Sequence, residues 1–257
     1  MKIIDFTGKI ALITGAAGAI GKTVAQQLAE NGAAVVITDL KEEQVQAAAS
    51  ELGCAGMAAD ITNAEQVKKV VDFTLELYGR VDILINVAGI VGQSLVEDLT
   101  EEEWDKMFAV NCKGTFLLTK YVVPQMKANN YGKIINYSSK SGKTGSALMS
   151  HYCAAKGAII SFTQALAYEL ADYNINVNCV CPGITDNSGV WANVSAGYTV
   201  NLQMSKDEVV KKFTAKIPLK RLATVRDVAA VTAFLASAGA DYMTGQAINI
   251  TGGREMH

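Results

Sequence analysis

The sequence predicts an α/β fold, in which a doubly wound parallel sheet of about seven strands carries helices on both faces. Strand-like and helix-like segments alternate almost throughout the 257 residues, which is the pattern of a parallel sheet connected by helices. The strand-like segments are apolar runs, as expected for strands that are buried on both faces. This length suffices for one large domain with a substantial core. We therefore expect a single domain over residues 1–257.

Short apolar or β-branched runs define the expected strands. The first is KIALIT at residues 9–14, and AVVITD at residues 34–39 is rich in β-branched side chains. VDILIN at residues 81–86 and INVNCVC at residues 175–181 have the same character. The complete set is expected over residues 9–14, 34–39, 54–60, 81–86, 133–138, 175–181 and 246–250.

Apolar spacing and capping residues define the helices between these strands. The first helix has apolar residues on one face and stops at Gly32, a natural C-cap. Asn63 or Thr62 is the expected N-cap of the third helix. Acidic residues open the long helix over residues 101–127, which suits the helix dipole. The helices are expected over residues 19–31, 41–52, 63–78, 101–127, 150–172 and 226–237.

One stretch departs from this regular alternation. Residues 184–216 are polar and mixed in character, and they are numerous enough to form a lid or substrate loop.

Composition excludes several classes of partner. A net charge of -2 gives no general attraction to nucleic acid or to an anionic membrane. No apolar run reaches membrane-spanning length, and the N-terminus lacks the profile of a signal peptide. The cysteines are odd in number and lack paired C-x-x-C spacing, so we expect reduced thiols in a cytoplasmic protein and no metal site. They are Cys54, Cys112, Cys153, Cys179 and Cys181.

A glycine-rich stretch, TGAAGAIG at residues 14–21, lies between the first strand and the first helix. A Rossmann-like dinucleotide fold needs glycine there for a tight turn and for close approach of the backbone to a pyrophosphate. Asp39 ends the second strand, where its carboxylate can accept hydrogen bonds from ribose hydroxyls and repel a 2′-phosphate. No arginine lies beside it, so we expect NAD and not NADP as the cofactor. Alternatively, or in addition, Asp39 caps the helix that begins at Lys41.

Tyr152 and Lys156 are four residues apart and share one face of an expected helix. A lysine ammonium about 4 Å from the phenol supplies roughly 4 kcal/mol at an effective dielectric of ~20. We therefore expect the pKa of Tyr152 to be lowered far enough for acid/base chemistry near neutral pH. A Tyr-x-x-x-Lys pair is a weak signal by itself.

Several motifs in order make the chain resemble the short-chain dehydrogenase/reductase family over nearly its whole length. Besides the glycine stretch, these are Asp60 after the third strand, NVAG at residues 86–89, and Asn111 within VNCKG. Ser139, Tyr152 and Lys156 match the remaining members of the family's active tetrad, and Pro182-Gly183 matches the element that flanks nicotinamide. The resemblance implies a cofactor site formed by Gly15, Ala17, Gly18, Ala19, Ile20, Gly21, Asp39, Leu40, Asp60, Ile61, Asn86, Ala88, Gly89, Tyr152, Lys156, Pro182, Gly183, Ile184 and Thr185.

The glycine loop departs from the family's usual T-G-x-x-x-G-x-G. Ala19 stands at the middle glycine, and Gly18 instead fits T-G-x-x-G-x-x-G, the spacing of longer members such as sugar-nucleotide epimerases. Chain length, NVAG and VNCKG favour the shorter branch. The methyl group of Ala19 therefore bears on how the loop approaches phosphate.

The resemblance also implies a role for each residue of the tetrad. Tyr152 would exchange the proton with the substrate oxygen, and Ser139 would hydrogen-bond that oxygen. Lys156 would lower the pKa of Tyr152 and hold the nicotinamide ribose, while Asn111 would hold a water that relays protons. Two alternatives stay open: Ser139 as a turn residue, and Asn111 as a helix-kinking residue with a backbone partner. His151 is expected to be a surface or cap residue, or else a substrate contact.

For the substrate, SKSGKTGS at residues 139–146, IPLKR at 217–221 and the ending GQAINITGGREMH are similar to sugar-alcohol dehydrogenases of the sorbitol-6-phosphate type. Lys140 and Lys143 would then meet a phosphate, or else lie in a solvated turn. Met149 and Trp191 are the other candidate substrate contacts. Small hydroxyketones of the acetoin type, 3-oxoacyl thioesters and a non-catalytic NAD sensor are the alternatives.

The family resemblance further implies a homotetramer. It would be built through the helices at residues 101–127 and 150–172, which are apolar on more than one face.

Overall fold

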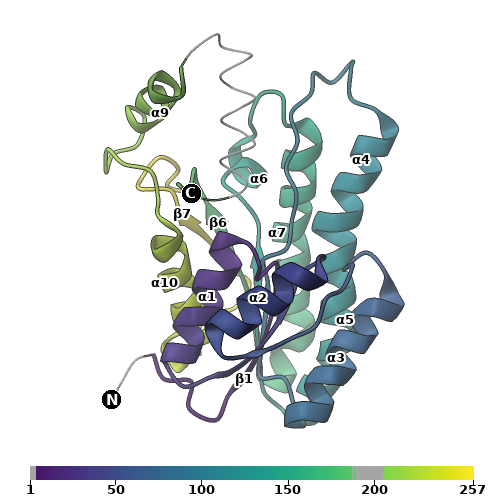
Figure 1. Ribbon diagram of the computed structural model, residues 1–257. Helices are drawn as coiled ribbons and strands as arrows, with labels where there is room; N and C mark the ends of the chain where they lie inside the picture. Colours follow the sequence, from purple (N-terminus) through teal and green to yellow (C-terminus); the bar gives the residue numbers. More distant parts are fainter. Residues whose placement is uncertain (1–3, 187, 189–204) are drawn as a thin grey trace.

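The computed structural model describes residues 4–186, 188 and 205–257. Its centre is a seven-stranded parallel sheet with the strand order β3-β2-β1-β4-β5-β6-β7 (Figure 1). The chain order reverses between β1 and β4, and the carboxyl ends of those neighbouring strands form the crevice where such folds bind ligands. The strands are β1 Ile10–Thr14, β2 Ala34–Thr38, β3 Ala55–Gly56, β4 Ile83–Asn86, β5 Gly132–Tyr137, β6 Ile175–Pro182 and β7 Ala247–Ile250.

Helices cover both faces of the sheet, as the sequence predicts (Figure 1). Buried side chains of α1 (Ala19–Glu30), α2 (Glu42–Leu52) and α10 (Val225–Ala236) share one apolar core with the strands. Those of α3 (Ala64–Tyr78), α5 (Thr115–Ala128) and α7 (Ser150–Leu170) share a second core on the other face. No helix in the described part of the chain is both long and apolar enough to cross a membrane.

The expected strand over residues 54–60 is reduced to the two residues of β3. Among the described strands it lies at the sheet edge and pairs with β2 alone. Beyond Gly56 the backbone still donates hydrogen bonds to that neighbour, from Met57 to Ile37 at 3.1 Å and from Ala59 to Asp39 at 2.9 Å. The prediction was therefore right about where this segment runs and wrong about the length of the regular strand.

The expected helix over residues 101–127 is three consecutive segments. They are α4 (Glu101–Phe108), a π-helical turn η1 (Ala109–Gly114) and α5. Inside the turn, the Asn111 side chain donates to the Met107 carbonyl oxygen at 3.0 Å. A side chain that competes for this carbonyl favours a local change of helical pitch.

Two α-helices in the described part of the chain were not predicted. The first, α6 (Ser141–Thr144), follows Ser139 closely, and the second, α9 (Lys206–Thr214), lies inside the expected substrate loop. Ser205 begins α9 with a capping box, because its hydroxyl and the Glu208 carboxylate each accept from the other's backbone N–H. Asn63 caps α3 as predicted.

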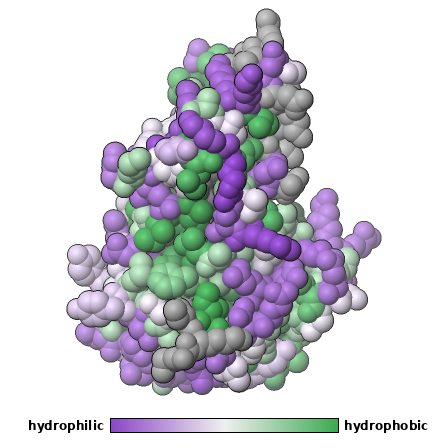
Figure 2. All heavy atoms as spheres, turned by 90° about the vertical axis from the view of Figure 1, so that its left-hand side faces the viewer, coloured by the Kyte–Doolittle hydropathy of each residue, from purple (hydrophilic) through white to green (hydrophobic). Residues whose placement is uncertain are grey.

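The side of the molecule formed by α9 and α10 is partly apolar. Figure 2 views this side and shows hydrophobic side chains gathered across its middle. Large exposed hydrophobic residues in the C-terminal part of the chain are Leu219, Tyr242 and Met256.

Candidate active site

The glycine loop connects β1 to α1 at the carboxyl edge of the sheet. Gly15 has a φ of +65°, and a methyl group added to it would lie 2.8 Å from the Ala88 backbone. A methyl group added to Gly21 would lie 2.3 Å from the Gly15 carbonyl oxygen. These two glycines therefore let α1 start directly above β1, with its free N–H groups facing the crevice where a pyrophosphate would bind.

Ala19, which replaces a family glycine, is accommodated without conflict. It opens α1 and is exposed, so its methyl group displaces no neighbouring backbone. Even a methyl group added to Gly18 would meet only the Gly15 carbonyl oxygen, at 3.3 Å. The departure from the usual spacing leaves the loop geometry intact.

Asp39 lies against this loop at the end of β2. Its carboxylate accepts from the Ala17 backbone N–H at 3.0 Å and from that of Leu40 at 2.7 Å. The N-cap residue of α2 is Lys41, and no described side chain caps this helix. The alternative role of Asp39 as the helix cap was therefore wrong. The nearby ammonium of Lys22 is paired with Glu51. Asp39 thus places its carboxylate beside the glycine loop, with no arginine next to it in the chain.

The remaining expected cofactor residues follow the other strands along the same edge. Asp60 accepts from the N–H and hydroxyl of Thr62, both at 2.8 Å, in a turn after β3. Asn86 is buried and donates to Asn136 at 2.9 Å, while the Ala88 N–H donates to the Thr14 hydroxyl at 3.1 Å. These strand ends are therefore fixed to one another by side-chain hydrogen bonds.

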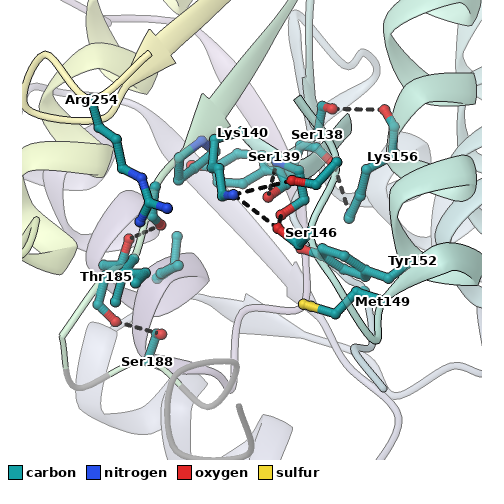
Figure 3. A pocket seen from close by; sticks show the side chains of 18 of the residues that line it. Ser138, Ser139, Lys140, Ser146, Met149, Tyr152, Lys156, Thr185, Ser188 and Arg254 are labelled. Atoms are coloured by element: carbon teal, nitrogen blue, oxygen red, sulfur yellow. Dashed lines mark hydrogen bonds between the residues drawn. The ribbon is translucent and has the colours of Figure 1, made fainter. Parts of the chain in front are cut away.

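A cavity of about 400 Å³ opens at this edge and brings most of the expected site residues together (Figure 3). Its wall contains Ser139, Tyr152 and Lys156 of the expected tetrad, and Lys140 and Met149 of the expected substrate contacts. Expected cofactor residues also line it: Ile20, Gly89, Pro182, Gly183, Ile184 and Thr185. The cavity is thus shared by the places expected for cofactor and for substrate.

Asn111 lies just behind this wall. Its amide donates to the carbonyl oxygens of Ile90 at 3.1 Å and Met107 at 3.0 Å, so the alternative of a backbone-bonded, helix-perturbing residue is correct. Its Oδ1 is buried and has no hydrogen-bond partner among the described residues. A methyl group added to Gly89 would lie 2.6 Å from this oxygen and 3.1 Å from Lys156 Nζ. An acceptor near the lysine is thus left for a water or ligand proton, as a relay requires.

Lys156 is buried and fixed at both ends. Its Nζ donates to the Tyr137 carbonyl oxygen at 2.8 Å. The backbone carbonyl oxygen of Lys156 accepts a hydrogen bond from the Ser138 hydroxyl at 2.7 Å. Burial lowers the pKa of Lys156 to about 8, although nearby cysteine thiols oppose this shift. The ammonium lies 5.8 Å from the centre of the Tyr152 ring.

Tyr152 does not show the lowered pKa that its spacing from Lys156 predicts. Burial raises the pKa of Tyr152 to about 12, and a hydrogen bond with Ser139 only partly opposes the rise. Removing the phenolate from water outweighs this single hydrogen bond. By itself the protein therefore holds Tyr152 as a protonated phenol at neutral pH.

Three other expectations for the substrate end need correction or lie out of reach. Lys143 donates to the Ala247 carbonyl oxygen of β7 at 2.7 Å and does not line the cavity, so its placement at a substrate phosphate was wrong. The turn that follows Lys140 sends the two lysines in different directions. His151 is buried and packs on Gly92, so it is not a surface residue. Trp191 lies outside the described residues.

Two cationic residues of the cavity wall were missed. Arg254 reaches it from the turn after β7, and Lys216 from the segment after α9. The Gly-Gly pair before Arg254 was a signal for a tight turn, but sequence reasoning had no means of placing that turn at the cavity that Tyr152 lines.

Comparisons with known proteins agree with this geometry. A family model described as Enoyl-(Acyl carrier protein) reductase matches residues 15–255. An uncharacterized oxidoreductase of Thermotoga maritima is 42% identical, over 97% of this chain and 98% of that protein. A sorbitol dehydrogenase of Cereibacter sphaeroides is 36% identical over 97% and 98%. A 3-oxoacyl-[acyl-carrier-protein] reductase of Vibrio cholerae is 37% identical over 98% and 100%.

Two solved structures share the fold closely. A single-residue variant of actinorhodin polyketide ketoreductase with NADPH has a TM-score of 0.94 and 32% identity, covering 97% of this chain and 98% of that one. Xylitol dehydrogenase bound to NAD+ has a TM-score of 0.91 and 33% identity, covering 96% and 99%. Similar folds therefore hold either nicotinamide cofactor.

Proposed function

This chain belongs to the short-chain dehydrogenase/reductase family of oxidoreductases acting on CH–OH groups, and we propose that it is an NAD-dependent dehydrogenase of sugar alcohols or their phosphates. It would interconvert a secondary alcohol and a ketone by hydride transfer. The observation that carries the proposal is the meeting of Ser139, Tyr152 and Lys156 in one cavity with Gly183 and Ile184. A single catalytic domain over residues 1–257 would hold the whole site.

In this proposal each tetrad residue acts on a proton or holds a group. During oxidation the Tyr152 oxygen takes the hydroxyl proton of the substrate, and the Ser139 hydroxyl hydrogen-bonds the same substrate oxygen. The Lys156 ammonium stabilises the phenolate that must form first. Asn111 Oδ1 accepts from a water through which the proton leaves. NAD supplies the acceptor for the hydride.

The residues present fit a dinucleotide. Methyl groups on Gly15 or Gly21 would fill the space in which the loop turns against β4 and α1. The N–H groups in the first turn of α1 have no intrahelical acceptor and can bind a pyrophosphate. Asp39 favours NAD, because a 2′-phosphate beside its carboxylate would be repelled. Exposed Leu40, next to it, offers an apolar surface for the adenine.

A polyol is preferred over an acyl thioester as substrate for one local reason. Hydroxyl groups of Ser139, Ser141, Ser146, Thr185 and Ser188 line the cavity with Lys140, and such groups suit a ligand with many hydroxyls. The sorbitol and xylitol dehydrogenases among the similar proteins support this choice. The alternatives are an acetoin-type hydroxyketone and a 3-oxoacyl thioester, the latter supported by the Vibrio cholerae relative. A third, more remote alternative is a protein that binds NAD as a sensor without catalysis.

The test is a direct assay. The purified protein is mixed with NAD or NADP and a panel of polyols at pH 9, and NADH or NADPH is followed by absorbance. Turnover of a polyol with NAD is expected, and acetoacetyl thioester with NADPH should react more slowly. Bound NAD without turnover of any alcohol or ketone would refute the enzyme, and faster thioester reduction would favour the alternative.

A substitution of Asp39 tests the cofactor preference. Asp39→Asn removes the charge beside the loop and should lower the preference for NAD over NADP by about tenfold or more, since one removed repulsion is worth ~1.4 kcal/mol or more. Glu43→Gln, which changes an exposed acid in the first turn of α2, is the matched control. An unchanged preference in the Asp39 variant would show that this carboxylate does not select the cofactor.

We further propose a homotetramer in the cytoplasm. On α4, α5 and α7, Trp104, Phe116 and Tyr168 are 41%, 45% and 90% exposed, which leaves large apolar groups without cover. The apolar side in Figure 2 offers a second contact face, as a tetramer of two-fold symmetric contacts needs. All five cysteines are free thiols, which suits a reducing compartment. A monomer in sedimentation at micromolar concentration would refute the assembly.

A further inference from the structure

The cavity has a cationic end for which the proposed proton transfer has no use. Lys140, Lys216 and Arg254 line it, and they come from three separate parts of the chain. In Figure 3, Lys140 lies between Arg254 and the pair formed by Tyr152 and Lys156. No carboxylate is among the described residues of the cavity wall. The wall therefore presents positive charge that no acidic neighbour in the same wall offsets.

The turn that carries Arg254 is tightly packed and closed by a hydrogen bond. Gly252 has a φ of +63°, and a methyl group added to it would lie 2.7 Å from the Ile217 side chain. The turn is closed by the Thr251 hydroxyl, which donates to the Glu255 carbonyl oxygen at 3.1 Å. Since Ile217 follows Lys216, this close packing ties the arginine and the lysine to the same part of the wall.

Lys140 is held in place without being neutralised. Its ammonium donates to the Ser146 hydroxyl at 2.8 Å and to the Gly145 carbonyl oxygen at 3.3 Å, both uncharged acceptors. Burial and the positive charge of Arg254 lower the pKa of Lys140, and the Glu255 carboxylate only partly opposes this shift. Among the described residues neither Lys140 nor Lys216 has an ion-pair partner. An anion placed between these groups would relieve their mutual repulsion.

Arg254 is only partly committed to an acidic neighbour. Its Nε lies 3.2 Å from a Glu255 carboxylate oxygen, and the guanidinium stacks 5.7 Å above the centre of the Phe213 ring. No hydrogen bond of its terminal amino groups is found within the described part of the chain. A guanidinium fixed in this way presents the planar fork that binds phosphate in two places.

We propose that Lys140, Lys216 and Arg254 form an anion subsite that receives the phosphate of a phosphorylated polyol while its secondary hydroxyl meets Tyr152. The proposal rests on the polyol dehydrogenase activity proposed above. Three cations and the Glu255 carboxylate leave a net charge of +2 at this end (3 − 1). A phosphate monoester carries about −1.5 to −2 at pH 7 and balances that charge, whereas a substrate carboxylate would balance half of it.

The competing explanation is that these cations bind the pyrophosphate of the cofactor. Gly183 and Thr185, which are expected cofactor residues, line the same cavity. The two explanations predict different kinetics. A subsite for the substrate phosphate changes KM for the phosphate ester alone, whereas a pyrophosphate contact changes KM for NAD with every substrate.

The first test compares sorbitol with sorbitol 6-phosphate, both oxidised with NAD. Arg254→Met keeps an apolar stem over Phe213 but removes the charge, and it should lower the preference for the phosphate ester at least tenfold, mainly through KM. Lys216→Met should lower that preference severalfold. Lys143→Met, at a lysine of the neighbouring turn that points away from the cavity, is the matched control and should leave it unchanged. Equal loss on both substrates, a raised KM for NAD, or a wild-type enzyme without preference would overturn the proposal.

A second measurement does not depend on turnover, and its first step uses the wild-type protein alone. Inorganic phosphate is titrated calorimetrically into the wild-type protein in the presence of NAD, and then into Arg254→Met after circular dichroism has confirmed its fold. Binding to the wild type that 0.5 M sodium chloride weakens is expected, as is its loss in the variant. No binding to the wild type overturns the subsite. Binding of phosphate by a protein that oxidises no polyol would instead keep the subsite and reject the polyol function.

Discussion

Replacing Lys156 by methionine should separate the two roles proposed for this lysine, which are to stabilise the Tyr152 phenolate and to hold the cofactor. In the structure the pKa of Tyr152 is raised to about 12, so a phenolate at pH 9 requires roughly 4 kcal/mol of added stabilisation, at ~1.4 kcal/mol for each pH unit. A positive charge about 5 Å away supplies roughly 3 kcal/mol at an effective dielectric of ~20. The Lys156 ammonium, 5.8 Å from the ring centre, therefore accounts for most of the requirement.

The state of Lys156 itself sharpens this expectation. Burial lowers its pKa to about 8, so the isolated ammonium is losing its proton at the pH where the phenolate is needed. The two groups must then titrate as a coupled pair, since a phenolate nearby favours the protonated lysine. Removal of the lysine should move the deprotonation of Tyr152 upward by about two pH units, which corresponds to the ~3 kcal/mol of lost attraction.

The assay is the pH dependence of kcat/KM for polyol oxidation between pH 6 and 11. The wild-type rate should rise with pH to a plateau. In Lys156→Met that rise should shift to higher pH, so that the loss exceeds 100-fold at pH 8 and shrinks toward pH 11. Methionine fills the buried space that the Lys156 side chain occupies. Fluorescence titration with NADH measures the cofactor affinity of the variant separately. A variant that loses the same factor at every pH would refute the electrostatic reasoning and leave Lys156 with cofactor binding alone.

Three further outcomes follow from local geometry. Gly21→Ala should abolish the rise in melting temperature that NAD gives the wild type, because the added methyl would lie 2.3 Å from a loop carbonyl oxygen, whereas Gly18→Ala, at 3.3 Å, should retain it. Thr224→Ala should lower the free energy of unfolding by about 1 kcal/mol in urea titrations, since it breaks the capping box of α10; an unchanged midpoint would contradict this. Hydrogen bonds from Arg221 hold the pKa of Asp227 well below its usual range. The stability that the Asp227 carboxylate gives the fold is therefore complete above pH ~4 and is lost as pH falls through the lower folded pKa. Asp227→Asn should therefore show a weaker loss of stability with acid than the wild type, and parallel curves would count against it.

Much of the fold was readable from the chain because its cues are local. The alternation of apolar strands with amphipathic helices indicated the parallel sheet, and the helix starts at Asn63 and Ala19 were found from capping and glycine spacing. Where a local pattern was overridden, the cause was a side chain or an edge. The Asn111 amide donates to a backbone carbonyl oxygen at the π turn, and β3 is an edge strand that is regular over two residues.

The candidate site likewise has a part that the sequence predicted and a part that it did not. Sequence spacing put Ser139, Tyr152 and Lys156 on two adjoining elements, and the structure brings all three to one cavity. Sequence spacing could not show that Lys140 lines the cavity while Lys143 does not. The direction of each side chain is set by the turn of α6 and by a β7 carbonyl oxygen more than a hundred residues away.

The sequence by itself thus determined the order in which the chemical groups follow one another along the chain, from the glycine loop to Asp39 and on to the tetrad. Only the tertiary structure decided that Arg254 and Lys216 reach the wall that holds Tyr152, and that burial raises the pKa of this tyrosine where spacing alone predicted a fall. The physical reason is common to both. Helix periodicity and turn chemistry act over a few residues, whereas desolvation and charge depend on every group that packing brings near, however distant in the chain.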